Sequence, residues 1–507
     1  MQEFEKQKIA EIQREKEEKV RKSLDASVKD AMAYNVMQGS GMNFISAFAI
    51  ALKATNFQVS MLTSLPQLFS AWIQLFSADL LERFKSRKKL ISIFVLLQAL
   101  TWLPMLLVPW LFLGETAAWF VILFYTLFYV FGAIIGPIWQ SLMGDLVPVE
   151  KRGQYFGMRN AAAGTITLIV TLFSGFYLNL YPKHLVFWGF AALFFLSFLA
   201  RMISRHYLNK MHEPPLPSNP QAKFSFSQFV GKMRSSNFGN FVLFVSSLNI
   251  AVNIAAPFFV VNMLKNLHFD YLTFTIITIA PMISSLFMMT YWGKITDKFG
   301  NKKIMRVCGF MVSLIPLYWL FFKDPVILFL CEFFISGFFW AGFNLAAANF
   351  LFDVTTPEKR TRCAAYYNIF NGTGVFVGAL IGGILATIIP NNFLNFSLNL
   401  YFIFLLSFIA RILVCLIFTN RIKEVRPVEQ IKDRQIFYNV IVNNPLMGFT
   451  IELITTLTTT AKKETGKIRK VPQMIGKGIQ EIDKEFGQVM EEVKETADKI
   501  VKRKKKN

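Results

Sequence analysis

Catalytic and metal-binding sequence motifs are missing from this chain, and charged residues are few. Only 17% of the 507 residues are charged, which is too few for an ordinary soluble multidomain protein. Four cysteines stand in or beside apolar stretches without the CxxC or Cys/His spacing of a metal site: Cys308, Cys331, Cys363 and Cys415. We interpret them as small buried apolar side chains and expect no metal.

Motifs for nucleotide hydrolysis and covalent catalysis are missing as well. No Walker A stretch, GxSxG elbow or HExxH pair stands in a plausible context, so we expect neither an enzyme nor an ATP-driven pump, and no cofactor. The first residues, EFEKQKIAEIQREKEEKVRK, are evenly charged and lack the apolar core and cleavage site of a signal peptide. We therefore expect no signal peptide.

Long apolar runs are abundant instead. Hydrophobic residues make up 54% of the chain, including 55 phenylalanines. Runs of about 18 or more apolar residues recur, and each can cross a hydrocarbon core of about 30 Å as a helix. They predict twelve membrane spans at 31–52, 59–79, 90–112, 118–143, 155–180, 184–208, 238–263, 270–292, 304–323, 326–351, 363–389 and 394–419.

The net charge of +22 is unevenly placed between these spans. Basic residues cluster in alternate connections, around 83–89, 151–152, 210–234, 294–306 and 359–362. The intervening connections hold only Lys53, Lys183, Lys265 and Lys323. This asymmetry follows the positive-inside rule and predicts a cell-membrane protein with both termini in the cytoplasm. Because topology explains the charge, we expect no nucleic-acid partner.

The chain repeats itself at an offset of about 208 residues. The stretch DLVPVEKRGQYFGMRNAAAGT (145–165) returns as DVTTPEKRTRCAAYYNIFNGT (353–373), and LSFLAR (196–201) returns as LSFIAR (406–411). The offset corresponds to six spans, so the halves are parallel repeats with one orientation. We predict an all-α integral membrane protein of two six-helix bundles.

Five segments follow from this organisation. Residues 1–30 form a charged cytoplasmic segment, 31–208 the first bundle, 209–237 a Pro- and Ser-rich cytoplasmic linker, 238–419 the second bundle, and 420–507 a cytoplasmic tail. The tail contains a candidate interfacial helix, IFYNVIVNNPLMGFTIELITTL, and a heptad stripe through Ile479, Phe486, Val493 and Ile500. The stripe fits either a surface helix on anionic lipid or a short coiled coil through which the chain self-associates.

One loop carries a family signature. In YWGKITDKFGNKKIM (291–305), the marked residues are Gly293, Asp297, Lys298, Gly300, Lys302 and Lys303. They resemble the Gly-x-x-x-Asp-Arg/Lys-x-Gly-x-Arg/Lys-Arg/Lys loop of the major facilitator superfamily. The equivalent first-half loop, SADLLERFKSRKKL, keeps Glu82 and Arg83 but has Ala78 and Lys85 in place of the glycines. The resemblance covers about residues 31 to 420 and implies a transporter fold.

Physical chemistry suggests a gating role for these loops. A glycine at the end of a span lets helices approach, and a loop glycine permits positive φ. A carboxylate at a helix end can accept hydrogen bonds from a neighbouring helix start. By the resemblance, Asp297 would face the fifth span near Gly153 to Phe156, and Glu82 the eleventh near Arg362 to Ala364. The repeated residues Asp145, Arg152, Asp353 and Arg360 would complete these cytoplasmic latches between the halves, or else serve topology alone.

The resemblance also implies a central cavity lined by the first, fourth, seventh and tenth spans. Polar and aromatic residues on those spans are Asn35, Gln38, Asn43, Trp139, Gln140, Asn249, Asn253, Trp340 and Asn344. Amides bind neutral polar groups, and Trp rings stack on flat molecules; helix-to-helix hydrogen bonds are the alternative. With no evident fixed charge in the cavity, we expect a small neutral or amphipathic solute.

Charged residues inside the spans are few. Glu332 is a candidate for proton coupling, although it lies only about 9 Å along its helix from the outer end and could reach interfacial water there. Arg201 and Arg411, near the cytoplasmic span ends, are interpreted as snorkelling anchors, with an interior ion pair as the alternative. The fifth span, NAAAGTITLIVTLFSGFYL, lacks the Gly-Pro motif common in antiporters of the superfamily.

The sequence therefore predicts a secondary active transporter that moves a small solute by alternating access, coupled to protons, with export favoured over uptake. The alternative is a transporter-like receptor or assembly factor that acts through its cytoplasmic tail.

Overall fold

The computed structural model describes residues 2–428, apart from 113, 149–151, 216–225, 232, 234, 356–359, 394–397 and 427. The chain divides into two units, Met1–Gln430 and Ile431–Asn507, and the described residues all lie in the first. The predicted interfacial helix and heptad stripe of the tail lie outside the described residues. Throughout the described part, every regular element is helical.

The first half contains the helices α1 (Gln2–Ser40), α2 (Ile45–Ala51), α3 (Asn56–Ile73), α4 (Ser77–Phe84), α5 (Arg87–Leu100), α6 (Trp102–Leu111), α7 (Glu115–Leu146), α8 (Arg152–Asn179) and α9 (Val186–Lys210), with the short turns η1 (Met42–Phe44) and η2 (Gln74–Phe76). Several join end to end into one span, such as α5 with α6. A capping box at Thr55 and Gln58 starts α3, since each side chain pairs with the other's backbone N–H.

The second half contains α10 (Phe226–Gly231), α11 (Asn237–Asn253), α12 (Ala256–Val261), η4 (Asn262–Asn266), α13 (Tyr271–Phe299), α14 (Asn301–Ser313), α15 (Ile315–Phe321), α16 (Pro325–Cys331), η5 (Glu332–Gly337), α17 (Phe338–Asp353), α18 (Arg360–Ile388), α19 (Asn399–Phe418) and η7 (Thr419–Arg421). Two of these, η4 and η5, are π-helical turns inside a span. The breaks before α12 and α15 fall next to Pro257 and Pro316, because proline cannot donate the helical hydrogen bond.

Each of the twelve predicted spans has a helical counterpart. Among the described residues, ten helical stretches are long and apolar enough to cross a membrane, from Arg87–Leu111 to Asn399–Arg421. The first two spans correspond to α1 with α2 and to α3. Neither meets the same criterion, because α1 begins in a charged sequence and α3 contains Asn56, Gln58 and Gln67. The prediction of an all-α membrane protein is confirmed.

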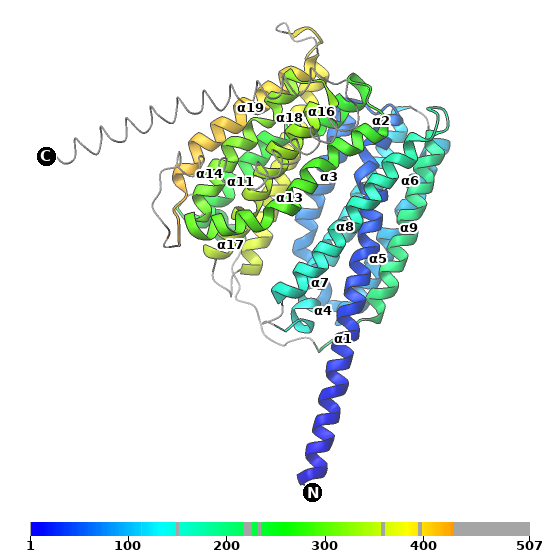
Figure 1. Ribbon diagram of the computed structural model, residues 1–507, viewed down its shortest axis with the longest axis vertical. Coiled ribbons are helices and arrows are strands. Elements are labelled where there is room, and N and C mark those ends of the chain that lie inside the picture. The colour runs from blue at the N-terminus through cyan, green and yellow to red at the C-terminus, as the bar shows by residue number, and fades with distance from the viewer. Residues whose placement is uncertain are drawn as a thin grey trace, which may run out of the picture. The chain divides into compact units, whose positions relative to one another are not determined.

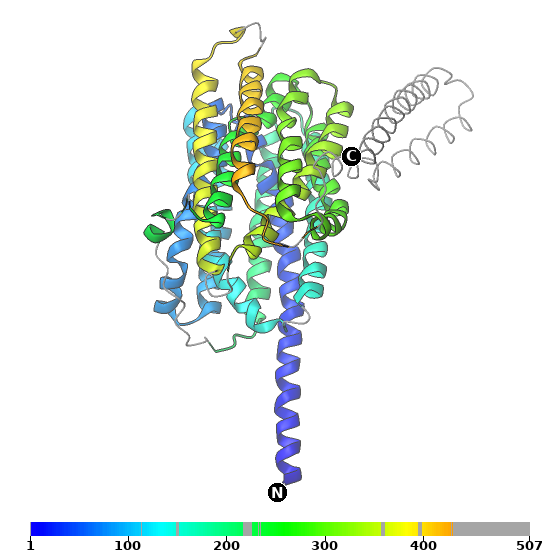
Figure 2. The same ribbon diagram turned by 90° about the vertical axis from the view of Figure 1, so that its left-hand side faces the viewer.

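Helix α1 runs without a break across the boundary predicted at residue 30. Its first residues protrude from the bundle in Figures 1 and 2. On the protruding part, Lys19 pairs with Glu15 at 2.5 Å and Lys22 with Glu18 at 2.7 Å, one helical turn apart. The lysines lower the pKa of both carboxyl groups. We call this end of the bundle the terminal side and the opposite end the far side.

The two halves meet along two seams, α3 against α18 and α8 against α13. These pairings relate the second and fifth spans of one half to the fifth and second of the other, as a two-fold axis along the bundle requires. The repeated glycines lie in them: a Cβ on Gly372 would stand 2.6 Å from the Ala71 Cβ, and one on Gly164 would stand 3.5 Å from Leu286 Cδ2. At the positions of these two glycines, α3 and α18 are packed more closely than α8 and α13.

Candidate functional site

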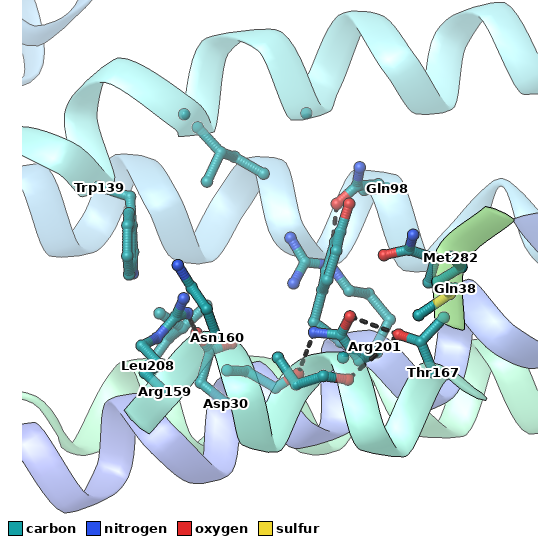
Figure 3. A pocket seen from close by; sticks show the side chains of 18 residues that line it. Asp30, Gln38, Gln98, Trp139, Arg159, Asn160, Thr167, Arg201, Leu208 and Met282 are labelled. Atoms are coloured by element: carbon teal, nitrogen blue, oxygen red, sulfur yellow. Dashed lines mark hydrogen bonds and ion pairs between the residues drawn. The ribbon is translucent and has the colours of Figure 1, made fainter. Parts of the chain in front are cut away.

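A cavity of about 510 Å³ lies where the first-half helices face α13. Its lining comes from α1, α5, α7, α8 and α9, with Met282 from the second half: Asp30, Ala31, Tyr34, Asn35, Gln38, Gln98, Gly132, Ile135, Gly136, Trp139, Arg159, Asn160, Ala163, Gly164, Thr167, Arg201, Leu208 and Met282. Figure 3 shows Trp139, Arg159, Asn160 and Asp30 toward one end, and Gln38, Thr167 and Met282 toward the other. Its volume suits a small organic molecule.

A buried carboxylate forms the first part of the polar lining. Asp30 on α1 accepts a hydrogen bond of 2.6 Å from Ser204 Oγ on α9, and its second oxygen lies 3.4 Å from Arg159 Nη2 on α8. Arg159 also donates from Nε to the backbone oxygen of Ser27 and stacks over the Trp139 ring at 4.4 Å. Three helices of one half are therefore tied together by one carboxylate.

Arg201 forms the second part, and it is not a snorkelling anchor. Its side chain is buried inside the bundle, donating from Nε to Gln98 Oε1 at 2.8 Å and from Nη1 to Ser204 Oγ at 2.7 Å. The guanidinium lies 4.9 Å from the centre of the Tyr34 ring. The snorkelling interpretation is wrong because the α9 face that carries Arg201 points toward α1 and α5, away from the lipid.

The expectation of a cavity without fixed charge is also wrong, because Asp30, Arg159 and Arg201 all line it. Sequence reasoning missed Asp30 because it stands on the predicted boundary of the first span. Arg159 and Arg201 lie near span ends, where basic residues commonly serve topology. The available signal was helical spacing: Asp30, Tyr34 and Gln38 recur every four residues and so share one face of α1.

Three of the nine predicted cavity residues line the cavity: Asn35, Gln38 and Trp139. Asn35 accepts a hydrogen bond from Thr167 there. The other six are absent from the cavity lining. Asn43 donates to Thr171, Asn249 to Asn371 and Asn253 to the Asn249 backbone, so these three bind within their own half. Gln140 and Asn344 are exposed, and Trp340 packs edge-on against Phe343.

The arginine that repeats Arg201 has a different environment. Arg411 is buried and donates to the backbone oxygens of Val312 at 3.0 Å and Val252 at 3.2 Å. These carbonyls lie at the breaks before α15 and α12. Pro316 lacks the N–H that Val312 would otherwise receive four residues on, so Arg411 supplies it. Snorkelling is therefore wrong for Arg411 as well.

Acidic residues at the terminal side bind within each half. In the first half, Arg87 at the start of α5 pairs with Asp145 at 2.6 Å, and the Arg87 backbone N–H donates to Glu213 at 2.5 Å. Glu213 also accepts from Ser86, and Arg87 Nη2 donates to the Pro214 oxygen. The start of the third span is thus held by residues that follow the fourth and sixth spans. We call this group the first clasp.

The second half repeats the arrangement with other residues. At the start of α14, Asn301 donates to Asp353 at 2.8 Å, and the Lys302 backbone N–H donates to Glu424 at 2.8 Å. Arg426 also bonds Asp353, at 2.9 Å from Nε, and this hydrogen bond raises the pKa of the guanidinium. We call this group the second clasp. Asp145 and Asp353 therefore hold equivalent positions, as their repetition in the sequence implies.

The predicted contacts between the halves are not made by these loops. Asp297 is 75% exposed and lies 3.4 Å from Arg426 of its own half, rather than against the start of α8. Glu82 and Arg83 are exposed and make no hydrogen bond or ion pair with other described residues. Arg152 donates to the Gly144 and Val147 oxygens at the end of α7. The latches remain a prediction for a conformation in which the terminal side is closed.

The signature glycines behave differently from each other. Gly300 has φ of +87°, as a tight turn requires, and a Cβ there would meet Glu424. The prediction that Gly293 lets two helices approach closely is wrong, since a Cβ there would have no heavy atom within 4 Å. Of the basic residues, Lys298 lies over the Phe299 ring, and the Lys302 backbone N–H donates to Glu424. Lys303 also interacts with other residues of the chain. Arg360 starts α18, and its side chain lies outside the described set.

Glu332 is buried apart from the cavity. It begins the π-helical turn η5 and accepts hydrogen bonds from Tyr318 at 2.7 Å and from Trp319 at 2.8 Å. Both donors lie on α15, so this carboxylate joins the ninth span to the tenth. It is absent from the cavity lining.

The comparison with protein families agrees with this architecture. The family model described as Major Facilitator Superfamily matches residues 31–261 and again residues 240–472. The chain belongs to the major facilitator superfamily. The double match corresponds to the two halves, and the family is one of membrane transporters rather than enzymes, as the sequence predicts. No curated protein matches the chain.

Solved structures share the fold at low sequence identity. A point mutant of the nucleoside transporter NupG aligns with a TM-score of 0.61 and 14% identity, over 79% of this chain and 100% of that chain. The D-xylose–proton symporter gives 0.60 and 12%, over 81% and 99%. A bacterial homologue of the iron transporter ferroportin, in an inward-facing state, gives 0.59 and 10%, over 80% and 99%. These similarities establish the fold alone.

Proposed function

We propose that this chain is a secondary active transporter of the cell membrane that carries a small solute by alternating access through the cavity lined by Asp30, Arg159 and Arg201. The observation that carries the proposal is a cavity with three charged side chains, lined by the first half and reaching Met282 of the second half. Charged groups inside a membrane bundle are costly unless they are paired or used, and they commonly mark a transport pathway. A site at the interface of two repeats can be opened to either side when the halves rock.

The contacts between the halves support a conformation closed at the far side. There, Lys265 Nζ donates to the Ala54 oxygen at 2.5 Å, and the Phe190 and Tyr271 rings lie 5.6 Å apart. A Cβ on Gly175 would stand 2.6 Å from the Thr275 Cβ. By the positive-inside pattern, the terminal side is cytoplasmic. We therefore interpret this structure as inward-facing.

Asp30 is the carboxylate best placed to couple solute movement to protons. It lines the cavity, and its two oxygens hold Ser204 and Arg159. Protonation would weaken its hold on the arginine and so link proton binding to the cavity's geometry. Glu332 is the second candidate, because it is also a buried carboxylate, although it does not line the cavity.

The test uses the full chain in proteoliposomes with an imposed pH gradient and an internal pH-sensitive dye. We expect solute-dependent proton movement in the wild type and its loss in Asp30→Asn. Glu332→Gln is the matched control, because it removes a buried carboxylate outside the cavity, and we expect it to retain proton movement. Unchanged coupling in Asp30→Asn, with loss in Glu332→Gln, would reverse the assignment. An absence of flux for every solute tested would favour the receptor alternative.

A further inference from the structure

The cavity carries more positive than negative charge. Its lining contains two guanidinium groups and one carboxylate. Arg201 is only 4% exposed, and the Arg159 side chain is 15% exposed. A buried charge without a counter-charge is expensive in a low-dielectric surrounding. An occupant that brings one negative charge would balance the site.

Each arginine also keeps a hydrogen-bond donor that the described protein does not use. Arg201 donates from Nε and Nη1, and no described residue accepts from its Nη2. Arg159 donates from Nε and Nη2, and no described residue accepts from its Nη1. Since both residues line the cavity, these donors are available to an occupant there. Guanidinium groups bind carboxylate and phosphate oxygens with strong, charge-assisted hydrogen bonds.

Both guanidinium groups are held in place before anything binds. Arg159 lies over the Trp139 ring and against Ser27, while Arg201 lies over the Tyr34 ring and against Gln98. A pre-positioned donor loses little side-chain entropy when it binds a ligand, which raises affinity. These supports make the site rigid on the first-half side.

We propose that the solute is a small organic monoanion whose carboxylate or phosphate group binds Arg159 and Arg201. This inference rests on the proposed function and names its substrate class. A cation would meet two arginines with one carboxylate already engaged by Ser204 and Arg159. A neutral solute would leave the excess charge in place. An inorganic anion would fill little of the 510 Å³, whereas Ile135, Leu208 and Met282 offer apolar cover for an organic remainder.

The charge of the solute also bears on direction. A membrane potential that is negative inside favours the exit of an anion by about 2.3 kcal/mol per 100 mV for each charge. An inward-facing, positively charged cavity would collect such a solute from the cytoplasm. The proposed export therefore fits an anionic solute better than a neutral one.

The test measures binding of charge-matched probe pairs to the purified full chain in neutral detergent, by titration calorimetry. Nicotinate is paired with nicotinamide and indole-3-acetate with its amide to test the carboxylate. The methyl phosphodiester of uridine, which carries one negative charge, is paired with uridine to test the phosphate. We expect the anionic member of at least one pair to bind about tenfold more tightly than the neutral one, because hydrogen bonds to a charged group contribute about 1.5–3 kcal/mol. Arg201→Gln and Arg159→Gln should remove that preference.

Arg205→Gln is the matched control. It stands one turn beyond Arg201 on α9 and donates to Ser92 outside the cavity, so it removes the same charge without changing the lining. We expect it to keep the anion preference. Equal or weaker binding of the anions in every pair, or an equal loss in Arg205→Gln and Arg201→Gln, would overturn the proposal. Saturable flux of a neutral probe in proteoliposomes would overturn the anionic substrate class but support the proposed transport. Binding of the anions without any flux would support the anionic ligand class but overturn the proposed transport.

Discussion

At the residue scale, one repeated arginine has taken two roles. Arg201 and Arg411 end the matching stretches LSFLAR and LSFIAR, and both are buried. Arg411 binds backbone carbonyls at two helix breaks, while Arg201 binds side chains and lines the cavity. Duplicated positions have therefore diverged, with the second-half copy bound to backbone at two helix breaks and the first-half copy lining the cavity.

The contacts of Arg411 predict a loss of stability when glutamine replaces it. Arg411→Gln removes the side-chain donor to the Val312 oxygen, which Pro316 cannot replace, at a cost of about 1–3 kcal/mol for that buried group. It also leaves the Val252 oxygen with the Ala255 N–H in place of two donors. We expect a lower midpoint of thermal unfolding in detergent, measured by intrinsic fluorescence. Arg205→Gln, whose side chain is only half buried, should change the midpoint little. An unchanged midpoint in Arg411→Gln would contradict the role assigned to the helix breaks.

At the element scale, the glycines of α18 let it pack closely on both of its neighbours. A Cβ at Gly374 would stand 2.7 Å from the Ser246 oxygen of α11, and one at Gly383 would stand 2.9 Å from Ser60 Oγ of α3. Ser60 itself donates to the Ala379 oxygen across the seam. Close approach of backbones is the usual source of stability between membrane helices. The Gly-rich eleventh span is thus explained by packing.

The two seams offer a matched pair of variants. Gly372→Ala places a methyl group 2.6 Å from the Ala71 Cβ and 2.8 Å from the Gln67 oxygen, so α3 and α18 must move apart. Overpacking of this kind costs about 1–3 kcal/mol. Gly164→Ala meets Leu286 at an ordinary 3.5 Å, and we expect it to be neutral or slightly stabilising, since alanine favours helix. Thermal unfolding of both variants checks this prediction. Equal unfolding midpoints would contradict the tighter packing inferred at Gly372 than at Gly164.

The clasps predict local effects at two helix starts. Glu424→Ala removes the acceptor of the Lys302 N–H, and loss of such a capping group costs about 0.5–2 kcal/mol. Hydrogen exchange measured by mass spectrometry should accelerate in the first turn of α14 and stay unchanged in α5. Glu213→Ala should give the reverse pattern. Glu82→Ala, at an exposed position, is the control and should leave exchange at both helix starts unchanged. Faster exchange at α5 or α14 in this control, or at both helix starts in either clasp variant, would contradict two separate clasps.

Sequence reasoning predicted the spans well and the cavity poorly, for one physical reason. Span length and the repeat are properties of continuous segments, so hydrophobic runs located all twelve helices. Which side chains share a cavity depends on helix rotation and on the partner helix. Arg201 illustrates this, since its distance from the span end suggested the interface, whereas its direction places it beside Gln98 on α5. The sequence did not predict Asp30 as a cavity residue, because α1 continues far beyond the apolar part that marks the span.

At the scale of the whole molecule, the proposed alternating access requires the far-side contacts to open when the terminal side closes. Gly175 and Thr275 are suited to test this, because they face each other across the α8–α13 seam near its far end. In a background with the four native cysteines replaced, we propose the double variant Gly175→Cys and Thr275→Cys. The two Cβ atoms would stand 2.6 Å apart in this packing, so α8 and α13 must separate by about 1 Å to reach the roughly 3.8 Å of a disulfide. Oxidation would then join the halves at that point.

The most direct measurement is flux of a bound solute by this double variant in proteoliposomes, before oxidation, after oxidation and after reduction. Alternating access predicts transport by the reduced protein, loss of transport when the disulfide locks the far side, and recovery with a reductant. Each single-cysteine variant should be insensitive to oxidation. Undiminished flux through the crosslinked protein would contradict alternating access through this cavity.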